Sequence, residues 1–146
     1  MEIKVSASAF DPWQILAEYQ TSRGPAASRR SGATAVFVGT MREINEEATV
    51  SALTLEHYPG MTERELERTV AAAVGEWSLD DALVWHRVGT VEPGDPIVLV
   101  AVWSTHRKAA FEACRHIMEV LKTRAPFWKQ EQRAQGRRWV EHNTPG

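Results

Sequence analysis

Residues 97–131 read IVLVAVWSTHRKAAFEACRHIMEVLKTRAPFWKQE, and this segment decides the fold class that we expect. The continuous apolar run at 97–103 predicts a buried strand. A helix over about 105–124 should follow, with a stripe of apolar residues at helical spacing: Phe111, Cys114, Ile117, Met118 and Leu121. Pro126 ends this helix, because proline pushes the preceding Ala125 towards an extended conformation.

Upstream of this segment, shorter patterns alternate between helix and strand. Asp11-Pro12 predicts the start of a short helix, since an N-cap acid is followed by proline at the first helical position. After it we expect a small, polar and basic loop at 21–32 and a buried strand at 33–40. A polar connection at 41–48 should lead to a second strand at 50–58.

The middle and the end of the chain complete the pattern. Thr62 and Glu65 form a capping-box pair that predicts a helix running to about Trp77. We expect a strand at 83–89, a tight turn at 92–95 leading into the strand at 97–103, and a short edge strand at 137–141. Helices mixed with hairpin-like strands predict an α+β fold, and we expect residues 1–146 to form a single domain because no linker or repeat interrupts them.

Length and composition suit a globular protein with an ordinary hydrophobic core. The 146 residues are 43% hydrophobic and 25% charged. The chain begins MEIKVSASAF, which lacks a basic region and an apolar run, so we expect no signal peptide. The longest apolar run is too short to cross a bilayer. One cysteine cannot form an internal disulfide, which fits a reducing compartment, and we expect a cytoplasmic protein with no membrane partner.

Charge is distributed unevenly along the chain. Residues 1–105 carry 8 basic and 15 acidic side chains, a net charge of −7, whereas residues 106–146 carry 9 basic and 4 acidic side chains, a net charge of +5. The basic end could bind an anionic ligand, an acidic partner or RNA, or it could be a solvated surface. We expect no nucleic-acid partner, because no recognised nucleic-acid-binding motif is present.

Three basic residues open the helix at 105–124. His106, Arg107 and Lys108 have the wrong sign for the helix dipole, which favours acids at this end. Their position is explained if an anion such as phosphate binds at the helix N-terminus. The alternative is that these side chains point into solvent.

Two lysines flank the apolar residues Phe127 and Trp128. Lys122 lies in the last helical turn, where a cation is favoured in any case, but Lys129 lies beyond the proline break. Apolar surroundings and a second cation would both lower the pKa of an ammonium group and make it a base or nucleophile near neutral pH. The alternative is an ordinary lysine that lies across the aromatic rings with its amine in water.

Other candidates are weaker. Arg42 follows a buried strand, where loops often carry function. Cys114 lies on the apolar stripe, so we interpret it as a core residue. His57 could be a ligand or a base, although a structural role is commoner. The sequence has none of the motifs HExxH, CxxC, a Walker loop or GxGxxG, so neither a metal site nor a bound cofactor is indicated.

Taken together, several stretches resemble the large, catalytic subunit of molybdopterin synthase. They are FVGTMRE, LTLEHYPGMTE, HRVGTVEPGD, KTRAPFWKQE and WVE, in this order over about residues 33–141. The resemblance implies an α/β hammerhead fold with an additional antiparallel β subdomain. It also implies transfer of sulfur from the C-terminal thiocarboxylate of a small ubiquitin-like carrier subunit to cyclic pyranopterin monophosphate. The product is the dithiolene of molybdopterin, and the implied assembly is a homodimer with one small subunit at each end.

The resemblance also implies a set of site residues. It places the catalytic pair at Lys122 and Lys129 and leaves the division of roles between them open. The implied substrate-binding residues are Thr40, Met41, Arg42, His106, Arg107, Gln130 and Glu131. The runner-up hypothesis is a non-catalytic module that docks a ubiquitin-like partner or RNA through the basic end. A chain ending Thr144-Pro145-Gly146 lacks the Gly-Gly of a sulfur carrier.

The sequence departs from the family pattern near Arg42. Ile44 stands in place of a common histidine, and Glu46-Glu47 occupy positions where a glycine is common. Met41 stands where valine is commoner, and the tail after WVE is short. These departures concern the local loop and leave the two lysines unchanged.

Overall fold

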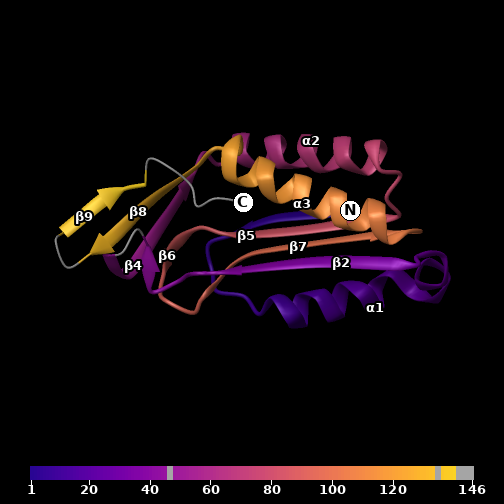
Figure 1. The fold of residues 1–146 in the computed structure, drawn as a ribbon, viewed down its shortest axis with the longest axis horizontal. Helices are drawn as coiled ribbons and strands as arrows, with labels where there is room; N and C mark the ends of the chain where they lie inside the picture. The colour runs from indigo at the N-terminus through magenta and orange to yellow at the C-terminus, as the bar shows by residue number, and fades with distance from the viewer. Residues whose placement is uncertain (46–47, 134–135, 141–146) are drawn as a thin grey trace.

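The computed structural model describes residues 1–45, 48–133 and 136–140 (Figure 1). The departure at Glu46-Glu47 and the tail after Val140 lie outside this range. Three helices and nine strands follow one another in the order β1 (Glu2–Ser6), α1 (Pro12–Arg30), β2 (Ala33–Thr40), β3 (Ile44–Asn45), β4 (Ala48–His57), α2 (Met61–Glu76), β5 (Asp81–Arg87), β6 (Gly89–Val91), β7 (Pro96–Ser104), α3 (Arg107–Thr123), β8 (Phe127–Arg133) and β9 (Gly136–Trp139) among the described residues.

The first sheet has the strand order β1-β5-β7-β2. β1 runs parallel to β5, whereas the β5–β7 and β7–β2 pairs are antiparallel. β7, the continuous apolar run of the sequence, lies inside the sheet and is buried from Val98 to Ser104. A strand covered on both faces needs apolar side chains on both, which explains why β7 shows no alternation.

Helices cover both faces of this sheet. In Figure 1, α2 and α3 lie above it and α1 lies below. The upper core joins Leu66 and Val70 of α2 to Ile117 of α3 and to Val100 of β7. The lower core contains the tryptophan ring of Trp103, packed against the partly buried apolar residues of α1. Cys114 is buried in the upper core, which confirms its interpretation as a core residue.

The second sheet extends from one end of the first (left in Figure 1). Its strand order is β3-β4-β8-β9, and β6 also pairs with β4. All these pairs are antiparallel. A small core of Met41, Val50, Leu53, Leu55 and Val91 stabilises it. A mixed sheet carrying helices together with an antiparallel sheet confirms the prediction of an α+β fold.

The prediction of a loop at 21–32 is wrong, because α1 continues to Arg30. The chain bends at Gly24, whose φ of 83° and ψ of 167° are not helical, and Pro25 begins the next helical turns. Proline is compatible with the first turn of a helix, so Gly24-Pro25 acts as a kink. Arg23 holds the kink against the sheet, since its Nε lies 3.2 Å from Oδ2 of Asp81 on β5.

The predicted start of α2 is also wrong in detail. The helix begins at Met61 after Gly60, and Glu63 accepts a hydrogen bond from the backbone N–H of Gly60 at 2.5 Å. Thr62, expected as the cap, is fully buried instead. Its Oγ1 accepts from the N–H of Tyr58 and donates to the carbonyl of Pro126. Thr62 therefore connects the start of α2 to the segment that follows α3.

Candidate active site

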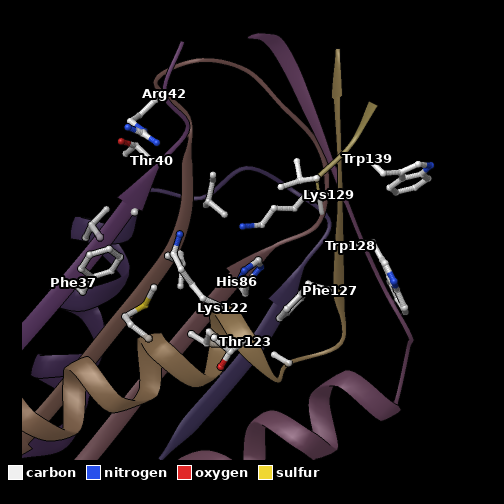
Figure 2. A pocket seen from close by; sticks show the side chains of 18 residues that line it. Phe37, Thr40, Arg42, His86, Lys122, Thr123, Phe127, Trp128, Lys129 and Trp139 are labelled. Atoms are coloured by element: carbon white, nitrogen blue, oxygen red, sulfur yellow. The ribbon is translucent and has the colours of Figure 1, made fainter. Parts of the chain in front are cut away.

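A cavity of about 550 Å³ lies where the two sheets meet (Figure 2). The end of α3, the end of β2, the first half of β8 and part of β5 form its walls. Its polar lining side chains are Thr40, Arg42, His86, Lys122, Thr123 and Lys129, and its large apolar ones are Phe37, Met118, Phe127, Trp128 and Trp139.

The break at Pro126 brings the two lysines into this cavity. α3 ends at Thr123, and the backbone N–H groups of the next two residues both bond to the carbonyl of Val120, at 2.8 and 3.0 Å. The chain then reverses, and β8 leaves along β4 in the other sheet. Lys122 therefore points into the cavity from the helix, while Lys129 points into it from the strand (Figure 2).

Burial makes Lys129 an unusually weak base for a lysine. Its pKa falls from 10.5 to about 8, chiefly because the cavity removes water from the ammonium. The charge of Lys122 lowers this pKa further, and the carboxylate of Glu131 opposes the effect. A measurable fraction of Lys129 is therefore neutral near physiological pH and can accept a proton.

The pKa of Lys122 is lowered as well. Burial lowers its pKa, and the guanidinium of Arg42 lowers it further, against the opposing charge of Glu119. Arg42 lines the same cavity, so three cationic groups face one space. Such a cavity favours an anionic ligand, because an anion would offset the repulsion among these cations.

Of the predicted substrate-binding residues next to Arg42 and Lys129, one lines the cavity and two are buried away from it. Thr40 lines the cavity, whereas Met41 is buried in the core of the second sheet. Glu131 is also buried, and its Oε2 accepts from Nε and Nη2 of Arg133 at 2.6 and 2.5 Å. The side chain of Gln130 lies outside the described part of the structure.

The other predicted anion-binding residues lie elsewhere in the same chain. His106 is the N-cap of α3 and Arg107 its first residue, and both side chains are exposed. Fifteen residues of helix separate Arg107 from Lys122, a rise of about 22 Å. Within one copy of the chain, the structure does not bring these residues to the cavity that contains the two lysines.

One lining residue, His86, was not singled out in the sequence. It lies on β5, is only 6% exposed, and its ring stacks on Phe127 with centroids 3.9 Å apart and planes 15° apart. The sequence signal was a single polar residue in the apolar strand ALVWH, which is weak without knowing that β8 passes over it. The aromatic lining residue Trp139 was missed for the same reason, because only the pairing of β9 with β8 brings it to the cavity.

Three further observations limit what the site and the chain can do. In the described parts of the chain, no three side chains among His, Cys, Asp and Glu come together as metal ligands would. Burial raises the pKa of Cys114 to about 11, so its thiol is protonated and packed in the core. Within those same parts, no helix combines the length and apolar character needed to cross a lipid bilayer.

Known proteins resemble the chain in both sequence and structure. The family model described as MoaE protein matches residues 5–124. A molybdopterin synthase catalytic subunit of Ralstonia nicotianae is 52% identical over 139 residues, covering 95% of this chain and 76% of the relative. The crystal structure of molybdopterin synthase from Staphylococcus aureus superposes with a TM-score of 0.81 at 28% identity, covering 94% of this chain and 96% of that one.

A third protein shares the fold at lower sequence identity. It is a chain from the complex of subunits 1 and 2 of molybdopterin-converting factor of Helicobacter pylori, with a TM-score of 0.78 at 23% identity, covering 97% of this chain and 92% of that one. At this identity the likeness concerns the fold alone. The family match spans most of the residues that build both sheets and the cavity, including Lys122. The chain belongs to the MoaE protein family.

Proposed function

We propose that the chain is the catalytic subunit of a molybdopterin synthase. It transfers sulfur from the C-terminal thiocarboxylate of a small ubiquitin-like carrier subunit to cyclic pyranopterin monophosphate, forming the dithiolene of molybdopterin. Family membership and the names of the relatives support this activity. The observation that carries it is the pair of amines, Lys122 and Lys129, in one cavity where burial lowers the pKa of both.

The proposed roles of the amines follow from their surroundings. Lys129, with a pKa of about 8, exchanges protons with the substrate as sulfur enters. Lys122 stabilises the negative charge of the thiocarboxylate or of the intermediate that it forms. Arg42 binds the substrate phosphate, since a guanidinium can contact two phosphate oxygens at once. Lysine suits the first two positions better than arginine would, because the pKa of its amine can be brought near 7.

A homodimer would complete the phosphate site. His106 and Arg107 lie about 22 Å from Lys122 along α3, so a single copy cannot bring them to its own cavity. β2 is the edge strand of the first sheet and has no outer partner strand among the described residues, and exposed apolar side chains lie on β2, at Val36 and Phe37, and on α3, at Phe111. We propose that two copies meet on this surface around a twofold axis, so that His106 and Arg107 of one copy approach the cavity of the other.

The runner-up hypothesis, a non-catalytic module that docks a ubiquitin-like partner or RNA, is not favoured. The relative with 52% identity is named as a catalytic subunit, and two amines with lowered pKa values serve no purpose in a docking surface. Binding to RNA would require an open cationic surface, whereas these two lysines are only partly exposed and line a cavity.

Reconstitution tests the activity directly. The purified protein, a thiocarboxylated carrier and cyclic pyranopterin monophosphate should yield molybdopterin, and Lys122→Ala or Lys129→Ala should abolish its formation. Arg115→Ala is the control, because Arg115 is an exposed cation of the same helix that neither lines the cavity nor lies at the helix start. Circular dichroism and gel filtration with the carrier check folding and docking. Full activity in both cavity variants would refute the catalytic role of the lysines.

Mixing two inactive variants tests the dimer. A copy with Lys122→Ala keeps its Arg107, and a copy with Arg107→Ala keeps its Lys122. A mixed dimer then contains one complete site, so an equilibrated equal mixture should recover about a quarter of wild-type activity. If the mixture stays as inactive as its components while light scattering shows dimers, then Arg107 does not act on the neighbouring cavity.

A further inference from the structure

His86 is the buried residue of the cavity that the proposed mechanism leaves without a role. Its ring lies against Phe127 and lines the same cavity as Lys122 and Lys129. Figure 2 shows the ring between the amine of Lys129 and the ring of Phe127. A histidine that is buried near the end of a core strand costs desolvation free energy unless its polar atoms are used.

One hydrogen bond determines the state of the ring. Nδ1 of His86 lies 2.8 Å from the carbonyl oxygen of Arg87. A carbonyl oxygen only accepts, so Nδ1 carries the proton, and in the neutral ring Nε2 has the free lone pair. Among the described residues the structure gives Nε2 no hydrogen-bond partner, and Nε2 is not one of the atoms that are buried without one. Nε2 is therefore accessible from the cavity.

The surroundings keep the ring neutral. Burial lowers the pKa of His86 to about 4. The hydrogen bond to the Arg87 carbonyl opposes this effect, but the charges of Lys129 on β8, His57 on β4 and Lys122 on α3 add to it. At neutral pH, His86 is an acceptor in a cavity whose charged side chains, Arg42 and the two lysines, are donors when protonated.

We propose that His86 is a specificity-determining residue whose Nε2 accepts a hydrogen bond from a ring N–H of the pterin. A reduced pterin with a cyclic phosphate has N–H donors at one end and an anion at the other. The cavity has the matching arrangement, with an acceptor on β5 and the cation Arg42 beyond the end of β2 (Figure 2). The pterin ring therefore lies towards His86 and its phosphate towards Arg42. This inference rests on the proposed function, because it takes the pterin as the ligand.

Two substitutions separate the acceptor from the rest of the ring. In His86→Asn, the amide can still donate to the Arg87 carbonyl but does not reach the position of Nε2. In His86→Gln, the longer side chain places an amide oxygen near that position. His116→Phe is the control, since His116 is a histidine of α3 whose ring packs at an angle against Trp77 and does not line the cavity. Thermal unfolding checks that each variant folds.

The measurement is calorimetric binding of cyclic pyranopterin monophosphate to the protein without the carrier, so that no turnover occurs. His86→Asn should weaken binding about 5- to 10-fold, as expected for one neutral hydrogen bond. His86→Gln should recover part of the loss, and the control should bind like the wild type. Inorganic phosphate, which lacks the pterin, should bind all variants equally. In turnover assays with the carrier, KM should rise in His86→Asn while kcat changes little.

Each other result refutes the proposal, and the results can be told apart. If the wild type binds the pterin and His86→Asn binds it equally well, the inference fails while the proposed function stands. If the wild type does not bind the pterin, both fail. If His86→Asn leaves pterin affinity unchanged but moves the pH at which Lys129 becomes reactive towards acetic anhydride, His86 acts through Lys129 and not on the substrate.

Discussion

Replacing Lys122 by glutamine should raise the pKa of Lys129. The two amines enter one cavity from different elements, and the positive charge of Lys122 is among the causes that hold the pKa of Lys129 down. Glutamine keeps most of the side-chain volume and removes the charge. The amine of Lys129 should then be protonated over a wider pH range, although the side chain itself is unchanged.

The size of the effect follows from the cavity. The drop from 10.5 to about 8 corresponds to about 3 kcal/mol by which the cavity disfavours the ammonium of Lys129. Burial is the largest cause, so we assign about one pH unit to the charge of Lys122, at the low end for a nearby charge. At pH 7.5 the neutral fraction of Lys129 would fall from about 25% to about 3%, an eightfold loss of the reactive form.

Competitive acetylation measures this quantity without requiring turnover. Acetic anhydride reacts with neutral amines, so the initial rate of acetylation at Lys129, followed by mass spectrometry across pH 6–11, gives its pKa. Lys108→Gln is the control, because it removes an exposed lysine at the other end of the same helix. We expect a midpoint of about 8 in the wild type and in the control, and about 9 in Lys122→Gln.

Two results would refute this reasoning. A wild-type midpoint near the ordinary lysine value of 10.5 would mean that the cavity does not desolvate Lys129. An unchanged midpoint in Lys122→Gln would mean that the two amines do not interact through the cavity, and the proposed catalytic pair would lose its physical basis.

Three further predictions concern stability. Lys129→Met should stabilise the fold by about 1–3 kcal/mol at pH 7, because the cavity disfavours the ammonium of Lys129. The stability of the wild type should approach that of Lys129→Met as pH rises from 8 to 10.5, since in this range only the unfolded wild type keeps the proton of Lys129. Urea unfolding at pH 7 and 10 measures both effects. Asp81→Asn should destabilise the fold by about 3 kcal/mol in the same assay, because it leaves the guanidinium of Arg23, whose side chain is 4% exposed, without its carboxylate. His86 takes up a proton below pH 6.5 in the unfolded state but only near pH 4 in the folded state. The free energy of unfolding of the wild type should therefore decrease as pH falls from 6.5 to 4, and it should decrease less in His86→Phe. Equal dependence of this free energy on pH in both proteins would show that another group is responsible.

Local patterns in the sequence predicted most of the helices and several strands. The apolar run at 97–103 and the stripe of α3 could be recognised locally, because a strand buried on both faces is continuously apolar and a helix buried on one face has an apolar stripe at helical spacing. β8 was missed because FWKQEQR has no clear alternation. It is a strand because β4 pairs with it over Val50–His57, a contact between segments far apart in the sequence. α1 was predicted too short because residues 21–32 are small, polar and basic, as in a loop, whereas the buried pairing of Arg23 keeps this part of the helix against the sheet.

The site was predictable in part and for a similar reason. The two lysines could be named from their aromatic neighbours and from the family resemblance, but helical spacing ends at Pro126 and could not show that they meet. His86 could not be selected, because its role depends on the passage of Phe127 over β5. The basic residues at the start of α3 were expected beside the lysines, but the helix axis separates them within one copy.

Lys122 belongs to a helix packed on the first sheet, and Lys129 belongs to a strand of the second, so the space between their amines depends on the angle between the sheets. Opening that angle would relieve their repulsion, and Lys129 would take up a proton. A carrier tail or substrate that wedges the sheets apart would thus be coupled to proton uptake from solvent. Proton uptake measured in weakly buffered solution would then report a change in the angle between the two sheets.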